Sequence, residues 1–164
     1  MKRKIHRSAK PEAYSWSRPT NYDLCPVGRN NLEVVQAVSR VSERGNAYWL
    51  ITAKTTVCQH AYIWETILTG PSSPPLTDKS FRFHRDRLAK FIYAMGHNPR
   101  EAMPSDPNLF SGRRFSADII HQPNLKKGGL LDAKVHYTRY FEYDPKHDII
   151  HKNNCPGYGE RRGG

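Results

Sequence analysis

The stretch from Asn31 to Leu68 decides the fold, and it reads NLEVVQAVSRVSERGNAYWLITAKTTVCQHAYIWETIL. Its first part, residues 32–41, is rich in valine, as strands commonly are. Residues 42–46 then supply turn formers, including Gly45 and Asn46, which tolerate a positive φ. A strand that ends in such a turn predicts a β-hairpin.

Two more segments of the stretch continue the sheet. Residues 47–57 and 62–68 are dense in aromatic and β-branched side chains, which fit a pleated and half-buried surface. Gly70 and Pro71 open a loop rich in serine and proline, through which no strand can run. The sequence therefore predicts three consecutive antiparallel strands that form a curved sheet.

A helix is predicted after this loop, because apolar side chains recur there with helical spacing. The apolar stripe is formed, at positions i, i+3, i+4 and i+7, by Leu88, Phe91, Ile92 and Met95. The cationic side chains that we assign to the other sides of the helix are Arg82, Arg85, Arg87 and Lys90. Thr77, Asp78 and Ser80 offer capping groups at its start, and Gly96 ends it. We expect the apolar stripe to lie in the core.

Two further strands are predicted in the second half of the chain. Gly112 precedes the first, residues 113–120, and residues 122–129 are interpreted as a long, flexible, basic loop. The second strand, residues 134–143, has two alternating sets of side chains. One set is Val135, Tyr137, Arg139, Phe141 and Tyr143, and the other is Lys134, His136, Thr138, Tyr140 and Glu142.

Three strands, a helix and two strands follow the order of an OB-fold, a five-stranded antiparallel barrel in which the helix between strands three and four plugs one end. The sequence thus predicts a mainly β, OB-fold-like domain. A length of 164 residues with 37% hydrophobic residues suits one domain with one core. We expect residues 1–19 to be a flexible basic arm, residues 20–146 the domain, and residues 147–164 a tail.

The charge balance indicates the kind of partner. There are 26 lysines and arginines against 15 acidic residues, which gives a formal net charge of +11. Such a surplus is typical of proteins that bind a polyanion, usually nucleic acid and less often a membrane surface, although a merely soluble basic protein is the alternative. No run is apolar enough for a membrane span or a signal peptide, so we expect a cytoplasmic protein without a membrane partner. The three cysteines are scattered, and we expect free thiols in a reducing compartment.

Short motifs along the predicted domain carry a resemblance to a known family. A Pro-x-Gly entry, Pro26 to Gly28, leads into two long strands around a glycine turn. The helix runs from Arg-Asp-Arg-Leu at 85–88 to Gly96, and a Leu-x-x-Gly-Arg step at 109–113 leads into strand four. Over residues 22–143 this pattern resembles the phage-borne proteins, formerly of unknown function, that are regarded as OB-folds similar to single-stranded-DNA-binding proteins.

The resemblance implies a non-catalytic protein that binds single-stranded DNA during phage replication or recombination, in the host cell cytoplasm and without a cofactor. It leaves open whether RNA is bound as well and whether protomers assemble into a homo-oligomer. Members of the family often carry an acidic C-terminal tail that recruits replication partners, whereas residues 159–164 of this chain include Arg161 and Arg162. The resemblance therefore does not extend to that recruiting role.

Binding of single strands requires a basic groove for the phosphates and aromatic rings on which bases stack. The candidate residues come from the sheet and from the loops around it, and they are Arg44, Tyr48, Lys54, Tyr62, Trp64, Arg113, Lys126 and Lys127. In a strand, Ile63 and Trp64 face opposite ways, and Ile63 together with Ile67 suits the interior better. We therefore expect Trp64 on the outside of the barrel. The alternative is that Trp49 or Trp64 fills the core instead of binding a base.

Two other classes of function remain as alternatives. One is an interaction protein, such as a phage inhibitor that docks its basic surface on a host protein or a nucleic-acid machine. The other is a metal-dependent nuclease, which would need clustered carboxylates to hold its metal ions. The acidic residues that could serve, Glu65, Asp118 and Asp132, are far apart in the sequence.

Three possible zinc ligands occur near the C-terminus. His147, His151 and Cys155 have the spacing of ligands on one side of a helix, and Cys58 or His60 could be the fourth ligand. The asparagines and the proline around Cys155 oppose a helix there. We therefore assign no metal and no cofactor to the chain.

Removal of residues 1–10 should make nucleic-acid binding less sensitive to salt. The cations of this segment are Lys2, Arg3, Lys4, Arg7 and Lys10, and cations on phosphates release condensed counterions. The slope of log affinity against log salt for a dT oligomer, measured by fluorescence anisotropy, should be steep for the full chain and smaller for the shortened one. An affinity that stays flat between low and moderate salt would contradict the electrostatic argument.

Overall fold

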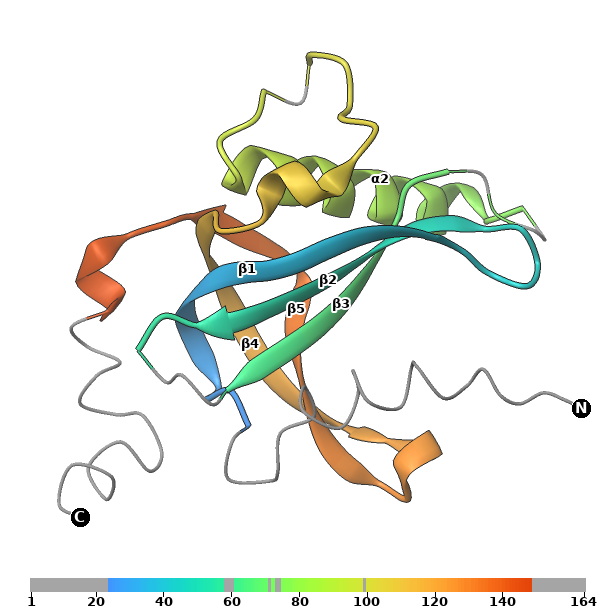
Figure 1. Cartoon of the computed structure of the whole chain (residues 1–164). Coiled ribbons are helices and arrows are strands. Elements are labelled where there is room, and N and C mark those ends of the chain that lie inside the picture. Colours follow the sequence, from blue (N-terminus) through green and yellow to red (C-terminus); the bar gives the residue numbers. More distant parts are fainter. Residues whose placement is uncertain (1–23, 58–60, 71, 73–74, 99, 149–164) are drawn as a thin grey trace, which may run out of the picture.

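The computed structural model describes residues 24–57, 61–70, 72, 75–98 and 100–148, which contain five strands and one long helix (Figure 1). The strands are β1 (Gly28–Val41), β2 (Ala47–Thr55), β3 (Tyr62–Leu68), β4 (Arg114–Asn124) and β5 (Leu130–Glu142). Helix α2 (Asp78–Ala94) comes between β3 and β4, and the short 3-10 helices are η3 (Pro107–Phe110) and η4 (Leu125–Lys127). The predicted order of three strands, a helix and two strands is confirmed.

All five strands belong to one antiparallel sheet with the order β3-β2-β1-β4-β5. β1 joins its two halves, because residues 32–41 pair with β2 and residues 28–33 pair with β4. A bulge between Val34 and Gln36 bends β1 close to where the two pairings meet. The sheet curls strongly, so that β3 and β5, the two ends of the order, come near each other (Figure 1).

We call the gap between β3 and β5 the seam. Within the described residues no strand ladder crosses it, so the sheet is open there and the predicted closure into a barrel is not observed. Side chains bridge the seam instead. Oε2 of Glu65 on β3 accepts a hydrogen bond of 2.9 Å from the amide of Val135 on β5. Arg87 of α2 donates to Oε1 of Glu65 and to the carbonyl of Thr66. The Nε of Arg87 also lies 3.4 Å from the carbonyl of Tyr137 on β5.

The spacing of Arg87 predicts that it lies on a solvent-facing side of the helix, and this prediction is wrong. Only 12% of its side chain is exposed, and its partner Glu65 is almost fully buried. Burial raises the pKa of the Glu65 carboxyl, and the charge of Arg87 opposes this shift. The sequence pattern missed the pair because an inward position of a strand usually holds an apolar side chain.

The core fills the space between the inner side of the sheet and α2. Phe91 stands at its centre and makes edge-to-face contacts with Phe110, Phe115 and Tyr140, with ring centroids 5.7, 6.0 and 5.5 Å away. The rest of the predicted apolar stripe packs beside it, since Ile92 and Met95 are buried and Leu88 is partly buried. The predicted core face of the helix is therefore confirmed.

Helix α2 begins and ends where its capping residues predicted. Thr77 Oγ1 accepts a hydrogen bond of 3.2 Å from the amide of Ser80, and Gly96 leaves the helix with a φ of 85°. None of the helices in the described ranges is long and apolar enough to cross a membrane.

The connection between β4 and β5 is a short hairpin, not the long flexible loop predicted for residues 122–129. β4 runs on to Asn124 and β5 begins at Leu130, so only η4 and two glycines separate the strands. The side chain of Asn124 accepts from the amide of Lys126 at 3.0 Å and donates to Asp132 at 2.6 Å. These bonds order a Lys-Lys-Gly-Gly sequence that by composition alone is typical of a linker.

β5 does not keep the alternation predicted for residues 134–143. In its ladder with β4, Val135 pairs with Ile119 and Tyr140 pairs with Ala117. Residues 136–139 lie between these two pairs and form a bulge. Val135 and Tyr140 are both buried, whereas Tyr137 is 65% exposed. Among the described residues, Tyr137 is also the one non-glycine with a positive φ, at 53°. A bulge of this kind shifts the side-chain phase, and strict alternation could not predict it.

The variant Arg87→Met should destabilise the fold by about 3–5 kcal/mol near neutral pH, because the buried Glu65 carboxylate loses its partner. The loss should shrink in acid. A carboxyl whose folded pKa is raised above its usual 4.5 favours folding when it is protonated, and this contribution disappears as the pH rises through the folded pKa. Urea unfolding at about pH 5 and about pH 7 measures both losses.

The double variant Arg87→Met with Glu65→Gln is the control for this prediction. It buries no charge at the seam, so it should be more stable than Arg87→Met alone near neutral pH and should lose most of the pH dependence. Equal stability of Arg87→Met and the natural chain at neutral pH would show that the pair does not hold the seam.

Candidate nucleic-acid interface

The outward sides of β2 and β3 form the face that carries Tyr48, Lys54, Tyr62 and Trp64. Alternate side chains are buried along both strands, which determines the side that each remaining residue faces. Ile63 and Ile67 are buried, so Trp64 lies on the outward side, where it is half-buried. Trp49 instead belongs to the core, with its ring centroid 5.9 Å from that of Phe110. The register predicted for β3 is confirmed.

Tyr62 and Trp64 form an aromatic pair on this outward face. Their rings are stacked, with 6.0 Å between the centroids and 24° between the planes. Across the ladder, Lys54 of β2 pairs with Tyr62, and Thr52 pairs with Trp64. The two strands thus place a cation beside two aromatic rings, which is the combination that a base and its phosphate require.

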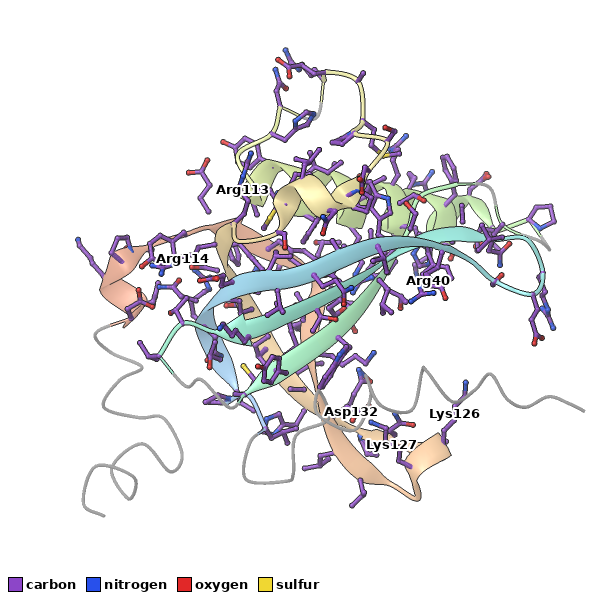
Figure 2. All side chains as sticks on the ribbon, in the orientation of Figure 1. Arg40, Arg113, Arg114, Lys126, Lys127 and Asp132 are labelled. Carbon is purple, nitrogen blue, oxygen red and sulfur yellow. The ribbon has the colours of Figure 1, made fainter. Side chains whose placement is uncertain are left out.

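A second group of cationic and aromatic residues lies at the other end of the same face. Tyr48 is near the start of β2, and Arg44 belongs to the exposed turn that leads into it. Arg40 of β1 is exposed and pairs with Tyr48 across the ladder (Figure 2). Sequence reasoning missed Arg40, although a hairpin closed by residues 42–46 would have put it opposite Tyr48.

Lys126 and Lys127 lie at the tip of the β4–β5 hairpin (Figure 2). Lys126 is exposed, whereas Nζ of Lys127 is 3.2 Å from Oδ1 of Asp132. Partial burial raises the pKa of Asp132, but hydrogen bonds from Asn124 and Lys127 outweigh it and leave that pKa below its usual value. In Figure 1 this hairpin and the β1–β2 turn project toward the same side of the molecule, one below and one above β3.

Arg113 is separate from the other candidates. Its Nη1 donates to the carbonyl of Met95 at 2.7 Å, which ties the end of α2 to the start of β4. Figure 2 shows Arg113 beside the helix, at the opposite end of the molecule from Lys126 and Lys127. The structure therefore brings Lys54, Tyr62 and Trp64 together and leaves Arg113 outside this group.

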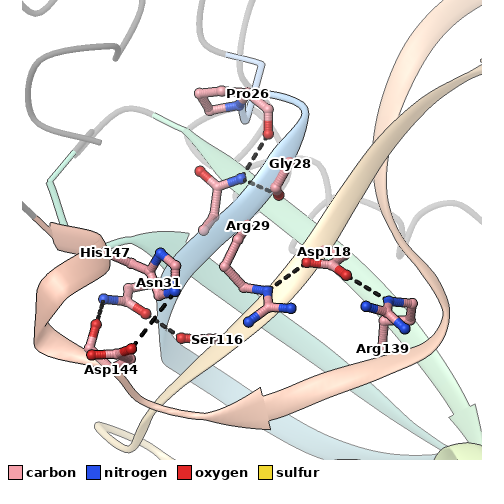
Figure 3. A network of polar contacts seen from close by, with 10 residues as sticks. Pro26, Gly28, Arg29, Asn31, Ser116, Asp118, Arg139, Asp144 and His147 are labelled. Atoms are coloured by element: carbon pink, nitrogen blue, oxygen red, sulfur yellow. Dashed lines mark hydrogen bonds and ion pairs between the residues drawn. The ribbon is translucent and has the colours of Figure 1, made fainter. Parts of the chain in front are cut away.

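A further cationic cluster, which sequence reasoning missed, lies on β1, β4 and β5 (Figure 3). Asp118 accepts hydrogen bonds of 2.5 Å from Nε of both Arg29 and Arg139. Partial burial raises the pKa of Asp118, but the two arginines outweigh this effect and lower it. The guanidinium of Arg29 also lies over the ring of Phe141, 3.8 Å from its centroid. Asp118 partly neutralises the two arginines, and Arg29 already stacks on Phe141, so we do not place base stacking at this cluster.

The carboxylates that a nuclease could use are engaged in separate ion pairs. Glu65 pairs with Arg87 at the seam, Asp118 pairs with the two arginines of Figure 3, and Asp132 pairs with Lys127. In the part of the chain that the structure describes, no group of three or more His, Cys, Asp or Glu side chains could hold a metal ion. His151, Cys155, Cys58 and His60 of the suggested zinc site lie outside that part.

Comparison with known proteins gives no family for this chain. No family model matches it, and neither does any curated protein. The outward face of β2 and β3 and the hairpins beside it carry the chemistry that points to a function.

Proposed function

We propose that this protein is non-catalytic and binds single-stranded nucleic acid along the outward face of β2 and β3. The observation that carries the proposal is the stacked pair of Tyr62 and Trp64 beside Lys54. Bases can stack on such rings without regard to sequence, and each stack contributes roughly 1–3 kcal/mol. The net charge of +11 supplies the general attraction to phosphates. We propose single-stranded DNA as the partner. Single-stranded RNA is the alternative, because it also offers unpaired bases and phosphates.

We also propose that the domain is an OB-fold-like barrel that is open at the seam. The sheet order, the long shared β1 and the helix between β3 and β4 agree with that topology. In a closed barrel β3 would pair with β5, and here Glu65 and Arg87 span the same gap. Binding between the β1–β2 turn and the β4–β5 hairpin is the usual arrangement for this architecture.

The resemblance to phage-borne proteins similar to single-stranded-DNA-binding proteins remains part of the proposal, with a role in replication or recombination. The motif glycines occupy positions where the backbone needs them. Gly28 opens β1 with a φ of 106°, Gly96 ends α2 at 85°, and Gly112 precedes β4 at 86°. A side chain at any of the three would strain the backbone, so these motif positions have a structural reason.

An interaction protein is the second candidate, and one observation favours it. Leu125, at the tip of the β4–β5 hairpin, is 87% exposed beside Lys126. Leu130 and Leu131 in the same hairpin are also exposed. An apolar tip with adjacent cations would suit a protein partner with an acidic rim. A protein with this function would show no affinity for dT oligomers. A fluorescence-anisotropy titration with a dT oligomer therefore separates the two functions.

The variant Trp64→Ala should lose roughly 1–3 kcal/mol of affinity for a dT oligomer, with little change in melting temperature. The reason is that Trp64 lies on the outward face, where its ring can stack a base but fills no part of the core. Anisotropy titration and thermal unfolding of the same preparation measure the two effects.

The control is Trp49→Ala, which removes the same ring from the buried core. It should destabilise by about 3–5 kcal/mol, and the molecules that remain folded should bind normally. If Trp64→Ala keeps normal affinity per folded molecule, the proposed binding face is wrong.

A further inference from the structure

A cavity of about 400 Å³ lies at the seam, beside the face proposed above. Its wall includes Thr66, which is on the outward side of β3 and exposed, two residues after Trp64. Two residues of a strand span about 7 Å, so a strand of nucleic acid on Trp64 reaches the cavity with its next units. The volume lies within the range of small-ligand pockets.

Tyr137 stands at this cavity in a strained conformation. A positive φ is unusual for a bulky residue and costs folding free energy. The residue is 65% exposed, so it is not held in this conformation by burial in the core. The ring centroid is 4.4 Å from that of His136 and 6.2 Å from that of Phe83, so the cavity has an aromatic wall.

The bulge has one structural task that does not explain the tyrosine. It brings the carbonyl of residue 137 to 3.4 Å from Nε of Arg87, and so helps to bridge the seam. Glycine would perform this task without strain, because the carbonyl belongs to the backbone. An exposed aromatic ring at a strained position in a cavity wall indicates a ligand that uses the ring.

Polar groups of the cavity match the edge of a base and its phosphate. His84 lines the cavity, although its Nδ1 is buried and has no hydrogen-bond partner among the described residues. Burial and the charge of Arg87 lower the pKa of His84, which favours the neutral ring. Gln122 adds an amide to the wall, and Lys134 adds a cation for a phosphate.

We propose that the seam cavity takes up one nucleotide of the bound single strand, with its base stacked on Tyr137 and its phosphate near Lys134. This inference rests on the proposed function, since the strand must first lie on the face of β3. It adds a second stacking position on β5, at a place that strict alternation of the strand would not reveal.

Photo-crosslinking of the full chain to 5-iodouracil-substituted dT oligomers tests the inference. Trypsin cleaves after Lys134 and Arg139, and therefore isolates Tyr137 in the five-residue peptide 135–139. Cleavage after Lys54 and Lys79 isolates Tyr62 and Trp64 together in peptide 55–79. Mass spectrometry of the crosslinked peptides thus reads the two stacking positions separately.

Crosslinks in both peptides are the expected result. Crosslinks in 55–79 without any in 135–139 would overturn the seam site and leave the proposed function standing. A chain that binds no dT oligomer would overturn both.

Substitutions give a second readout that a purely structural role would not produce. Tyr137→Gly should raise the melting temperature by relieving the strain, yet weaken binding to a dT oligomer about 5- to 100-fold through the loss of one stacked base. Tyr137→Phe keeps the ring and should bind normally. The matched control is Tyr93→Ala, which removes a 56% exposed tyrosine from α2, away from the cavity lining, and should leave affinity unchanged. Normal affinity of Tyr137→Gly would contradict the proposal.

Discussion

Arg87 reaches from α2 into the seam and joins strands that lie at the two ends of the sheet. Its guanidinium donates hydrogen bonds to Glu65 and to the carbonyl of Thr66 on β3, and to the carbonyl of Tyr137 on β5. Glu65 completes the bridge by accepting a hydrogen bond from the amide of Val135 on β5. A buried ion pair costs desolvation, so its benefit lies less in net stability than in fixing one arrangement of the groups around it. These contacts stand where a strand ladder between β3 and β5 would close the curled sheet.

The same constraint connects the seam to the proposed binding face. Side chains of a strand alternate, so a register of β3 that points Glu65 inward must point Trp64 outward. A slip by one residue would bury the tryptophan and expose the carboxylate, leaving Arg87 without its partner. On the other side of the seam, the bulge that delivers the carbonyl of Tyr137 to Arg87 also turns the exposed ring of Tyr137 outward. The stability of the seam and the proposed binding therefore depend on one local geometry.

Local patterns predicted the elements of this fold, but not the contacts that couple them. The valine-rich and aromatic segments gave the first three strands, and the spacing of Phe91 with its neighbours gave the core face of α2, because both signals act over a few residues. Glu65 and Arg87 gave no such signal, since each is unusual for its position and only tertiary structure pairs them. The bulge of β5 and the hydrogen bonds of Asn124 likewise depend on the partner strand. For the candidate site, the phase of β3 predicted the outward Trp64, and the turn at residues 42–46 could have placed Arg40 opposite Tyr48. Tyr137 required the actual pairing of β4 with β5.

We propose that the outward face of β2 and β3 binds unpaired bases. An anisotropy titration of the full chain with a labelled dT oligomer and with a duplex of the same length, at one low salt concentration, tests this. Both ligands carry phosphates that attract the cations of the protein. Only the single strand offers unpaired bases that can stack on Tyr62 and Trp64. The single strand should bind at least about tenfold more tightly than the duplex, as one stacked base would give. Equal affinity for the two ligands, or no binding of either, would contradict it.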